Sequence, residues 1–158
     1  MAQKKRSKQA SGAVLNRRAR FDYELGDELE AGLVLTGPEV RAARDGHVQL
    51  KGSFVTIRNG ELWLNNASFS LRLNKKGDPT ARTIDTSPRK LLASRKEINA
   101  LEAKKQQGSN IIPTRMLTKK NHIKLVIALG KGKKNYDKRE TLKRRDQNRE
   151  AQRAIKNS

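Results

Sequence analysis

The chain has 158 residues, of which 36 are Lys or Arg and 16 are Asp or Glu, so its formal net charge at pH 7 is +20. An excess of this size favours a polyanionic partner, with nucleic acid as the first candidate. The chain holds no cysteine, which excludes disulfides, thiolate zinc sites and cysteine nucleophiles. No apolar stretch approaches the roughly 18 residues of a membrane span, and no secretion signal is visible. We therefore expect a cytoplasmic protein without a membrane partner.

The charge divides the chain into three regions. Residues 1–20 carry seven basic residues and no acid, residues 131–158 carry eleven basic and four acidic residues, and residues 21–130 carry eighteen and twelve. The middle region holds most of the large apolar residues and has the length of one folded domain. We predict a flexible basic arm at 1–15, one β-barrel domain at 16–130 and a basic tail at 131–158.

Strands and a short helix are predicted after the arm. Apolar residues alternate with polar ones in FDYEL (21–25) and in ELEAGLVL (28–35), and an alternation of period two is typical of strands. Thr36-Gly37-Pro38 then ends the second strand. Pro38 suits the first turn of a short helix, which ends at Asp45-Gly46.

Residues 47–58 and 61–73 are predicted as two strands joined by a hairpin turn. The turn is Asn59-Gly60, a dipeptide that accepts the positive φ values of a type I′ turn. Residues 74–88 lack periodicity and contain Gly, two Pro, Asn and Asp. This composition predicts a mobile connection.

A second helix and a last hairpin complete the domain. Ser94 and Glu97 form a capping box, and Gly108 ends the helix that they begin. The apolar segments 111–117 and 123–130 flank TKKNH and predict a hairpin, whose second strand is too apolar for an exposed edge. The sum is a mainly β (α+β) fold: a small antiparallel β-barrel of about six strands with two or three flanking helices.

The tail combines helical spacing with a lack of apolar residues. Asp137 is a candidate N-cap with Glu140 three residues later, yet Leu142 and Ile155 are too few to hold a helix against a core. We expect a tail that is disordered when free and helical when bound to RNA. A solvated solubility tail is the alternative; Tyr136, which lies among lysines, favours stacking on an unpaired base.

No constellation for catalysis is visible in the sequence. His47 and His122 lie in separate contexts without a partnered ligand spacing. GKGKK (130–134) lacks the spacing and the Ser/Thr of a phosphate-binding loop. We expect no enzymatic activity, no metal and no cofactor.

Five segments are distinctive in combination: NRRARFDYEL, EAGLVLTGPEVRAARDG, LKGSFVTIRNGELWLNN, RKLLASRKEINAL and IKLVIALGKGKKNYDKR. In order and spacing they resemble the small protein B (SsrA-binding protein) family of bacteria, over about residues 14–145. The resemblance implies an oligonucleotide-binding (OB-like) barrel that binds the tRNA-like domain of transfer-messenger RNA. It also implies delivery of that RNA to stalled ribosomes for trans-translation, which rescues the ribosome and tags the peptide, while the tail enters the empty decoding centre and messenger channel.

The resemblance also implies site residues. RNA contacts on the barrel are implied at Asn16, Arg17, Arg18, Glu30, Leu92 and Lys124. Contacts of the tail with small-subunit ribosomal RNA are implied at Lys131, Lys133, Lys134, Tyr136, Asp137, Lys138 and Arg139. The residues alone favour a structural reading of three of these positions: Glu30 as an exposed strand acid, Leu92 as a core residue and Lys124 as a solvated lysine.

Two other functions stay open at the level of the residues. The first is a ribosomal or ribosome-assembly protein that binds ribosomal RNA permanently and copurifies with all ribosomes. The second is a nucleic-acid-processing enzyme with metal-dependent turnover, for which the sequence offers no residues. We expect the chain itself to be a monomer.

Overall fold

The computed structural model describes residues 13–157, so most of the predicted basic arm lies outside the described residues. In chain order the elements are β1 (Val14–Leu15), α1 (Arg17–Asp22), β2 (Tyr23–Leu33), α2 (Gly37–Arg44), β3 (Val48–Gln49), β4 (Phe54–Arg58), β5 (Glu61–Asn65), β6 (Ser68–Arg72), β7 (Arg82–Asp85), β8 (Arg89–Leu92), α3 (Arg95–Gln106), β9 (Asn110–Thr118), β10 (Ile123–Gly132) and α4 (Asn135–Lys156).

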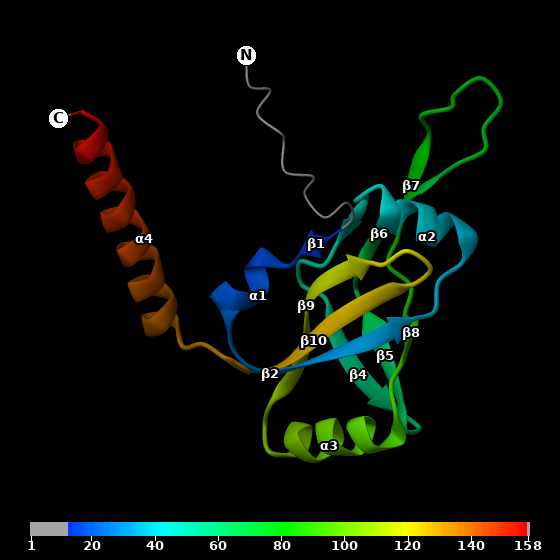
Figure 1. Ribbon diagram of the computed structural model, residues 1–158, viewed down its shortest axis with the longest axis horizontal. Coiled ribbons are helices and arrows are strands. Elements are labelled where there is room, and N and C mark those ends of the chain that lie inside the picture. Colours follow the sequence, from blue (N-terminus) through cyan, green and yellow to red (C-terminus); the bar gives the residue numbers. More distant parts are fainter. Residues whose placement is uncertain (1–12, 158) are drawn as a thin grey trace.

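Six strands close into an antiparallel barrel. They follow the order β9, β10, β2, β8, β5 and β4, and β4 returns to β9 through the pairing of Val55 with Ile111. Figure 1 shows α3 across the lower end of the barrel, α2 near its upper right and α4 projecting to the left. The predicted mainly β fold with a barrel of about six strands is confirmed. Helices α1, α2 and α3 flank the barrel, and α4 forms the tail.

The core fills the barrel from alternating positions of its strands. β10 lies between β9 and β2, as predicted for so apolar a strand, and its residues Leu125 and Ile127 are fully buried. Each large apolar side chain buried in this way stabilises the fold by about 1.5–3 kcal/mol. The largest fully buried apolar side chains are Phe69, Leu50, Leu62, Leu64, Leu91, Ile111, Met116, Leu125 and Ile127.

The prediction of a strand at 21–25 was wrong for its first residues. Phe21 belongs to α1, and β2 is one uninterrupted strand of 11 residues. The helix begins because the Asn16 side chain accepts a hydrogen bond from the backbone N–H of Ala19, at 3.3 Å. This N-cap satisfies a donor at the start of the helix, and it outweighs the short alternation that includes Phe21.

Each long strand predicted on either side of Asn59-Gly60 is divided in two. The hairpin turn itself is confirmed, with φ values of 52° at Asn59 and 73° at Gly60. Positive φ values at Gly52 (74°) and Asn66 (62°) break the flanking segments. The chain therefore leaves the barrel at both points, and β3 and β6 join β7 in a second, three-stranded sheet.

Residues 74–88, predicted as a mobile connection, contain the strand β7. It pairs with β6 in a register that runs from Phe69 opposite Asp85 to Arg72 opposite Arg82. The two strands form a ribbon that extends to the upper right in Figure 1. Its outward face is solvated, and Ile84 there is 72% exposed. β7 is a strand of four residues that pairs with the short strand β6 and has one face in water. Its sequence therefore lacks the alternation of apolar and polar residues by which a strand is predicted.

The other predicted helices and the last hairpin are confirmed, with one correction in the tail. Ser94 and Glu97 form the expected capping box of α3. Helix α4, however, has Lys134 and not Asp137 as its N-cap. Asp137 lies in the first turn instead, where a negative charge interacts favourably with the helix dipole.

Arg89 joins the second sheet and α2 to the barrel. Its guanidinium lies 3.3 Å from the Glu39 carboxylate and 3.7 Å from that of Asp85, and its side chain is 3% exposed. The guanidinium carbon also lies 3.8 Å from the centroid of the Phe69 ring. A buried cation requires such pairing, so Arg89 fixes the relative position of three elements.

Candidate nucleic-acid interface

Three of the predicted RNA-binding residues lie together on the outer face of the barrel. Gly32 of β2 is opposite both Leu92 of β8 and Lys124 of β10 in the strand register. Glu30 precedes Gly32 by two residues and therefore points to the same face. The structure thus brings Glu30, Leu92 and Lys124 together from three neighbouring strands, and we call this surface the barrel face.

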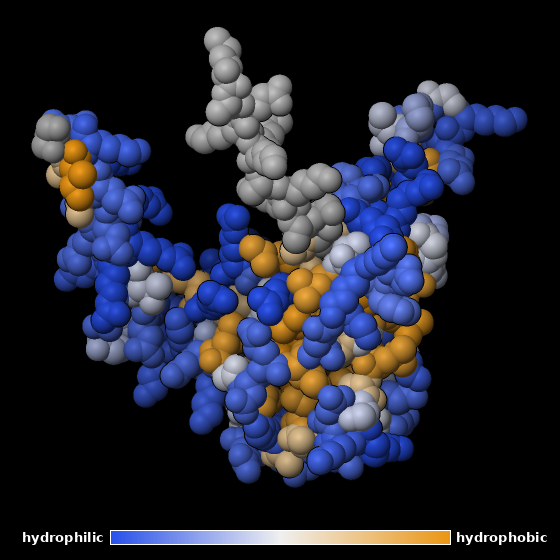
Figure 2. Space-filling view, in the orientation of Figure 1, coloured by the Kyte–Doolittle hydropathy of each residue, from blue (hydrophilic) through white to orange (hydrophobic). Residues whose placement is uncertain are grey.

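The glycine at the centre of the barrel face allows this close arrangement. A Cβ atom at Gly32 would lie 3.2 Å from the Leu92 Cβ and 3.7 Å from the Lys124 Nζ. Leu92 is 55% exposed, which excludes the reading of Leu92 as a core residue. Figure 2 shows apolar atoms over the front of the barrel, bordered by hydrophilic side chains.

Glu30 is paired within the barrel face. The ammonium group of Lys119, from the end of β9, forms an ion pair with its carboxylate. This hydrogen bond lowers the pKa of Glu30 below its usual value, and the positive charges of Lys119, Lys124 and Arg115 add to the effect. Glu30 is therefore an ionised acceptor surrounded by cations, next to an exposed leucine.

Asn16 has a structural position. Its side chain is buried and donates hydrogen bonds to the backbone carbonyls of Leu50, at 3.1 Å, and Pro113, at 2.8 Å, while its oxygen caps α1. It holds α1 against β9 and the segment after β3. Arg17 and Arg18, by contrast, are exposed on α1, so Asn16 orients the helix that carries these two cations.

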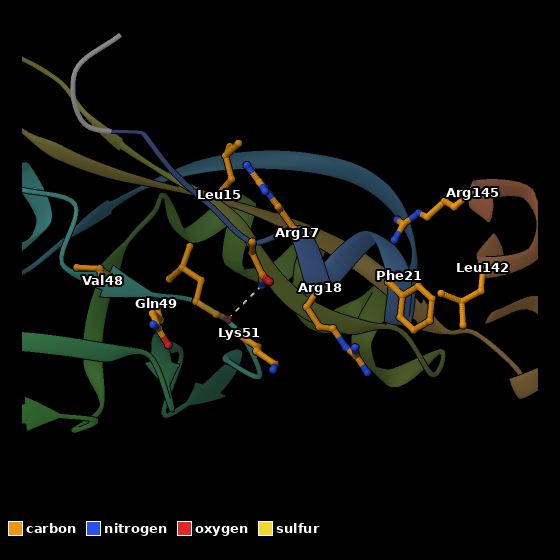
Figure 3. A pocket seen from close by; sticks show the side chains of 11 residues that line it. Leu15, Arg17, Arg18, Phe21, Val48, Gln49, Lys51, Leu142 and Arg145 are labelled. Atoms are coloured by element: carbon orange, nitrogen blue, oxygen red, sulfur yellow. Dashed lines mark hydrogen bonds between the residues drawn. The ribbon is translucent and has the colours of Figure 1, made fainter. Parts of the chain in front are cut away.

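A basic cavity of about 620 Å³ lies between α1, the segment after β3, and α4. Figure 3 shows Phe21 facing Leu142 of α4, with the Arg145 side chain reaching toward the ring. The guanidinium carbons of Arg18 and Arg145 lie 4.9 Å and 5.8 Å from the ring centroid. Arg17 and Lys51 also line the cavity, so α1 and the tail together make an aromatic and cationic surface.

Asp22 fixes the base of the tail to α1. Its carboxylate pairs with Arg18 at 3.0 Å and with Lys138 at 3.3 Å, and its backbone carbonyl accepts a hydrogen bond from the Lys133 N–H at 2.9 Å. The Lys133 ammonium group donates to the carbonyl of Arg20, also at 2.9 Å. Asp22 and Phe21 were not predicted as site residues, because their contacts with the tail join residues more than a hundred positions apart and no local pattern reveals them.

The remaining predicted tail residues are largely solvated. Tyr136 is 64% exposed, and its hydroxyl donates a hydrogen bond to Glu140 at 3.2 Å. The negative charge of Glu140 and this hydrogen bond raise the pKa of Tyr136 above its usual value. Lys131, Lys134 and Arg139 are exposed, and Asp137 is half-buried. An exposed aromatic ring among cations suits contact with a base and its phosphates.

Residues 13–157 contain neither a side-chain cluster for a metal ion nor a helix that could cross a membrane. No group of three or more His, Cys, Asp or Glu side chains in this range is arranged to hold a metal ion. Within the same residues, no helix combines the length and the apolar character that crossing a bilayer requires.

Comparisons with known proteins agree on one family. The family model described as SmpB protein matches residues 13–157. SsrA-binding protein of Shouchella clausii (strain KSM-K16) is 47% identical over 89% of each chain, and that of Lacticaseibacillus casei (strain BL23) is 42% identical over 99% of this chain and 98% of its own. A solved structure described as "tmRNA-SmpB: a journey to the center of the bacterial ribosome" is 32% identical, with a TM-score of 0.59 over 83% of this chain and 94% of that one. The chain therefore belongs to the SmpB protein family.

Proposed function

We propose that this chain is a non-enzymatic adaptor that binds the tRNA-like domain of transfer-messenger RNA and delivers it to stalled ribosomes for trans-translation. The observation that carries the proposal is the barrel face, where β2, with its paired carboxylate Glu30, lies between the exposed Leu92 of β8 and Lys124 of β10. The names of the relatives, SsrA-binding protein, support the RNA partner. The solved neighbour, described with tmRNA at the centre of the bacterial ribosome, supports the second partner.

In this proposal the barrel face recognises the folded RNA. Leu92 contacts exposed bases, Lys124 and Lys119 contact phosphates, and Glu30 accepts hydrogen bonds from a base amino group or a ribose hydroxyl. Unpaired bases at the bend of a tRNA-like fold offer such groups. Arg17 and Arg18 extend the positive surface toward the tail.

The tail has a separate role on the ribosome. α4 projects away from the barrel in Figure 1, and eight Lys or Arg residues lie between 135 and 156, against four acids. We propose that Lys131, Lys134, Tyr136 and Arg139 contact small-subunit ribosomal RNA at the empty decoding centre. Lys133 and Lys138 hold the start of the helix against α1, and Asp137 lies in its first turn. A tail that becomes helical only on binding RNA stays a prediction.

Removal of the tail separates the two roles. β10 extends to Gly132 and the N–H of Lys133 bonds to Asp22, so a chain that ends after Lys134 keeps the whole barrel. We expect this shortened chain to bind the tRNA-like domain as the full chain does. We also expect it to give no peptide tagging in a reconstituted translation system with a message that lacks a stop codon.

Two outcomes would contradict the proposal. Tagging at the full rate by the shortened chain would mean that the tail has no role on the ribosome. Stoichiometric copurification of the full chain with all ribosomes, stalled or not, would instead identify a permanent ribosomal component. The cytoplasm, where ribosomes translate, is the proposed site of action, and a monomer is the proposed state.

A further inference from the structure

A second basic cavity lies between α2 and the ribbon of β6 and β7. Its volume is about 360 Å³, and it lies at the upper right of Figure 1, where α2 and β6 are side by side. Three arginines line it: Arg41 from α2, Arg72 from β6 and Arg82 from β7. Asp45 is the one acid among its lining residues. We call this cavity the arginine cleft.

The charges in the arginine cleft are not balanced by the fold. Arg72 and Arg82 lie directly opposite each other in the strand register, and like charges in that position destabilise a β-ribbon. Among residues 13–157, none of the three arginines forms an ion pair with a carboxylate. Three guanidinium groups around one cleft repel one another when no carboxylate pairs with them, so their placement points to an external anion.

One of the three guanidinium groups, that of Arg82, is held in place by the fold itself. The side chain of Arg82 donates to the Ser70 hydroxyl and to the Ser70 carbonyl, each at 3.0 Å. The nearest acids of the ribbon are used elsewhere. Asp78 accepts hydrogen bonds from Thr80, and Asp85 accepts them from Ser87. Arg82 is therefore a fixed donor, and these two acids of the ribbon do not pair with it.

The arginine cleft continues the barrel face. Arg44, on the same helix as Arg41, donates a hydrogen bond to the carbonyl of Lys120 at 3.2 Å. Lys120 follows Lys119, which pairs with Glu30 on the barrel face. A line of positive charge thus runs from Lys124 over the β9–β10 connection to α2.

We propose that the arginine cleft binds phosphates of the same RNA that lies on the barrel face, and so extends recognition beyond the residues that the family resemblance implies. Guanidinium groups match phosphate oxygens in geometry and bind them with two parallel hydrogen bonds. The site contacts the phosphates of the RNA and not its bases, so it helps to position the RNA without selecting a base sequence. This inference rests on the proposed function, because the ligand is the RNA of that proposal.

The test compares two triple variants that each remove three positive charges. The first is Arg41→Gln/Arg72→Gln/Arg82→Gln in the cleft. The matched control is Arg58→Gln/Arg95→Gln/Lys96→Gln, with exposed side chains at the end of β4 and the start of α3. Figure 1 shows α3 at the end of the barrel away from α2. Equilibrium binding to the tRNA-like domain of transfer-messenger RNA is measured over a salt series, with elongator tRNA as competitor.

The cleft variant is expected to bind the tRNA-like domain at least about tenfold more weakly than the unchanged chain does. The reason is that each hydrogen bond between a charged side chain and a phosphate contributes about a factor of ten to the affinity. Its plot of log affinity against log salt should also be flatter by about two, because each lost phosphate contact removes about 0.7–0.9 from the slope. The control should retain the slope of the unchanged chain. Equal losses in both variants would overturn the inference, because the cleft would then add only general charge.

The stability of Arg72→Gln provides an independent test. If the cleft is a ligand site, relief of the repulsion with Arg82 should leave the thermal midpoint unchanged or raise it, while RNA binding weakens. A lower midpoint with unchanged RNA binding would mean that Arg72 is structural and would overturn the inference. If the unchanged chain does not prefer the tRNA-like domain over elongator tRNA, the proposed function itself fails, which is a separate outcome.

Discussion

Glu30 is a carboxylate on the surface for which we propose a polyanionic partner. Its charge is compensated by Lys119, and the pair lies beside Lys124 and the exposed Leu92. In the proposed function Glu30 therefore has two roles. It would accept hydrogen bonds from base or ribose donors, and it holds the Lys119 ammonium group at a defined place. An unpaired acid at this place would repel phosphate.

Replacement of Lys119 by Met should raise the pKa of Glu30 toward its usual value, since the hydrogen bond from Lys119 is the largest cause of the lowering. In the unchanged chain the folded-state pKa lies below the unfolded one. The stabilisation by the pair of Glu30 and Lys119 is therefore complete at pH values above the pKa of Glu30 in the unfolded state. It is lost as the pH falls through the pKa of Glu30 in the folded state. Carboxyl NMR titration measures the shift. Lys120→Met is the control, and an equal shift in both variants would contradict the assigned pair.

Arg89 is expected to be the most sensitive charged residue of the fold. Arg89→Met removes one partner of a buried ion pair and leaves Glu39 without its cation, so the free energy of unfolding should fall by about 3 kcal/mol or more. Urea denaturation measures the change. The control is Lys90→Met, which breaks a half-exposed pair with Glu61 and should cost less than about 1 kcal/mol. A similar cost for both variants would contradict a central role of Arg89.

At the scale of elements, the direction of the tail depends on one contact region. The base of the tail is held by Asp22 and Arg20 of α1, and the contacts of α4 with Phe21 and the basic cavity come from Leu142 and Arg145. The turns of α4 after Arg145 project from the barrel in Figure 1. The position of a long helix is thus set within its first three turns.

Asp22→Asn and Lys138→Gln should each widen the distribution of distances between the barrel and the start of α4, because each removes one side of the ion pair. The chain has no cysteine, so spin labels can be placed specifically at Asn99→Cys and Lys143→Cys and measured by pulsed electron resonance. Arg149→Gln, further along α4, should leave the distribution unchanged. The contact would lose its assigned role if Asp22→Asn gave the same narrow distribution as the unchanged chain.

Local signals predicted the elements that local chemistry controls. The capping box of Ser94 and Glu97 gave the position of α3, and Asn59-Gly60 gave the hairpin turn, because each depends on residues a few positions apart. β7 escaped detection, since a strand with a solvated face is defined by its partner β6 and not by its own pattern. The single-strand reading of 47–58 failed at Gly52, where one positive φ value redirects the chain.

At the scale of the whole molecule, the candidate site was only partly visible in the sequence. The resemblance identified Glu30, Leu92 and Lys124, and the barrel supplies the register that places them on one face. It could not supply the contact of Asp22 with the tail, nor the opposition of Arg72 and Arg82, which both depend on tertiary structure. The net charge of +20 indicated a polyanion; the fold divides that charge among the barrel face, the arginine cleft and the tail.

This division of charge leads to the most direct test of the account, which is a competition measurement with two chains. The full chain and the chain that ends after Lys134 are each titrated with the tRNA-like domain of transfer-messenger RNA, in the presence of excess elongator tRNA. The account predicts tight binding that resists the competitor for both chains, because recognition lies in the barrel and the tail serves the ribosome. Two results together would contradict the account: elongator tRNA displaces the tRNA-like domain from the full chain, and the shortened chain does not bind. The positive charge of this protein would then give only a general affinity for RNA.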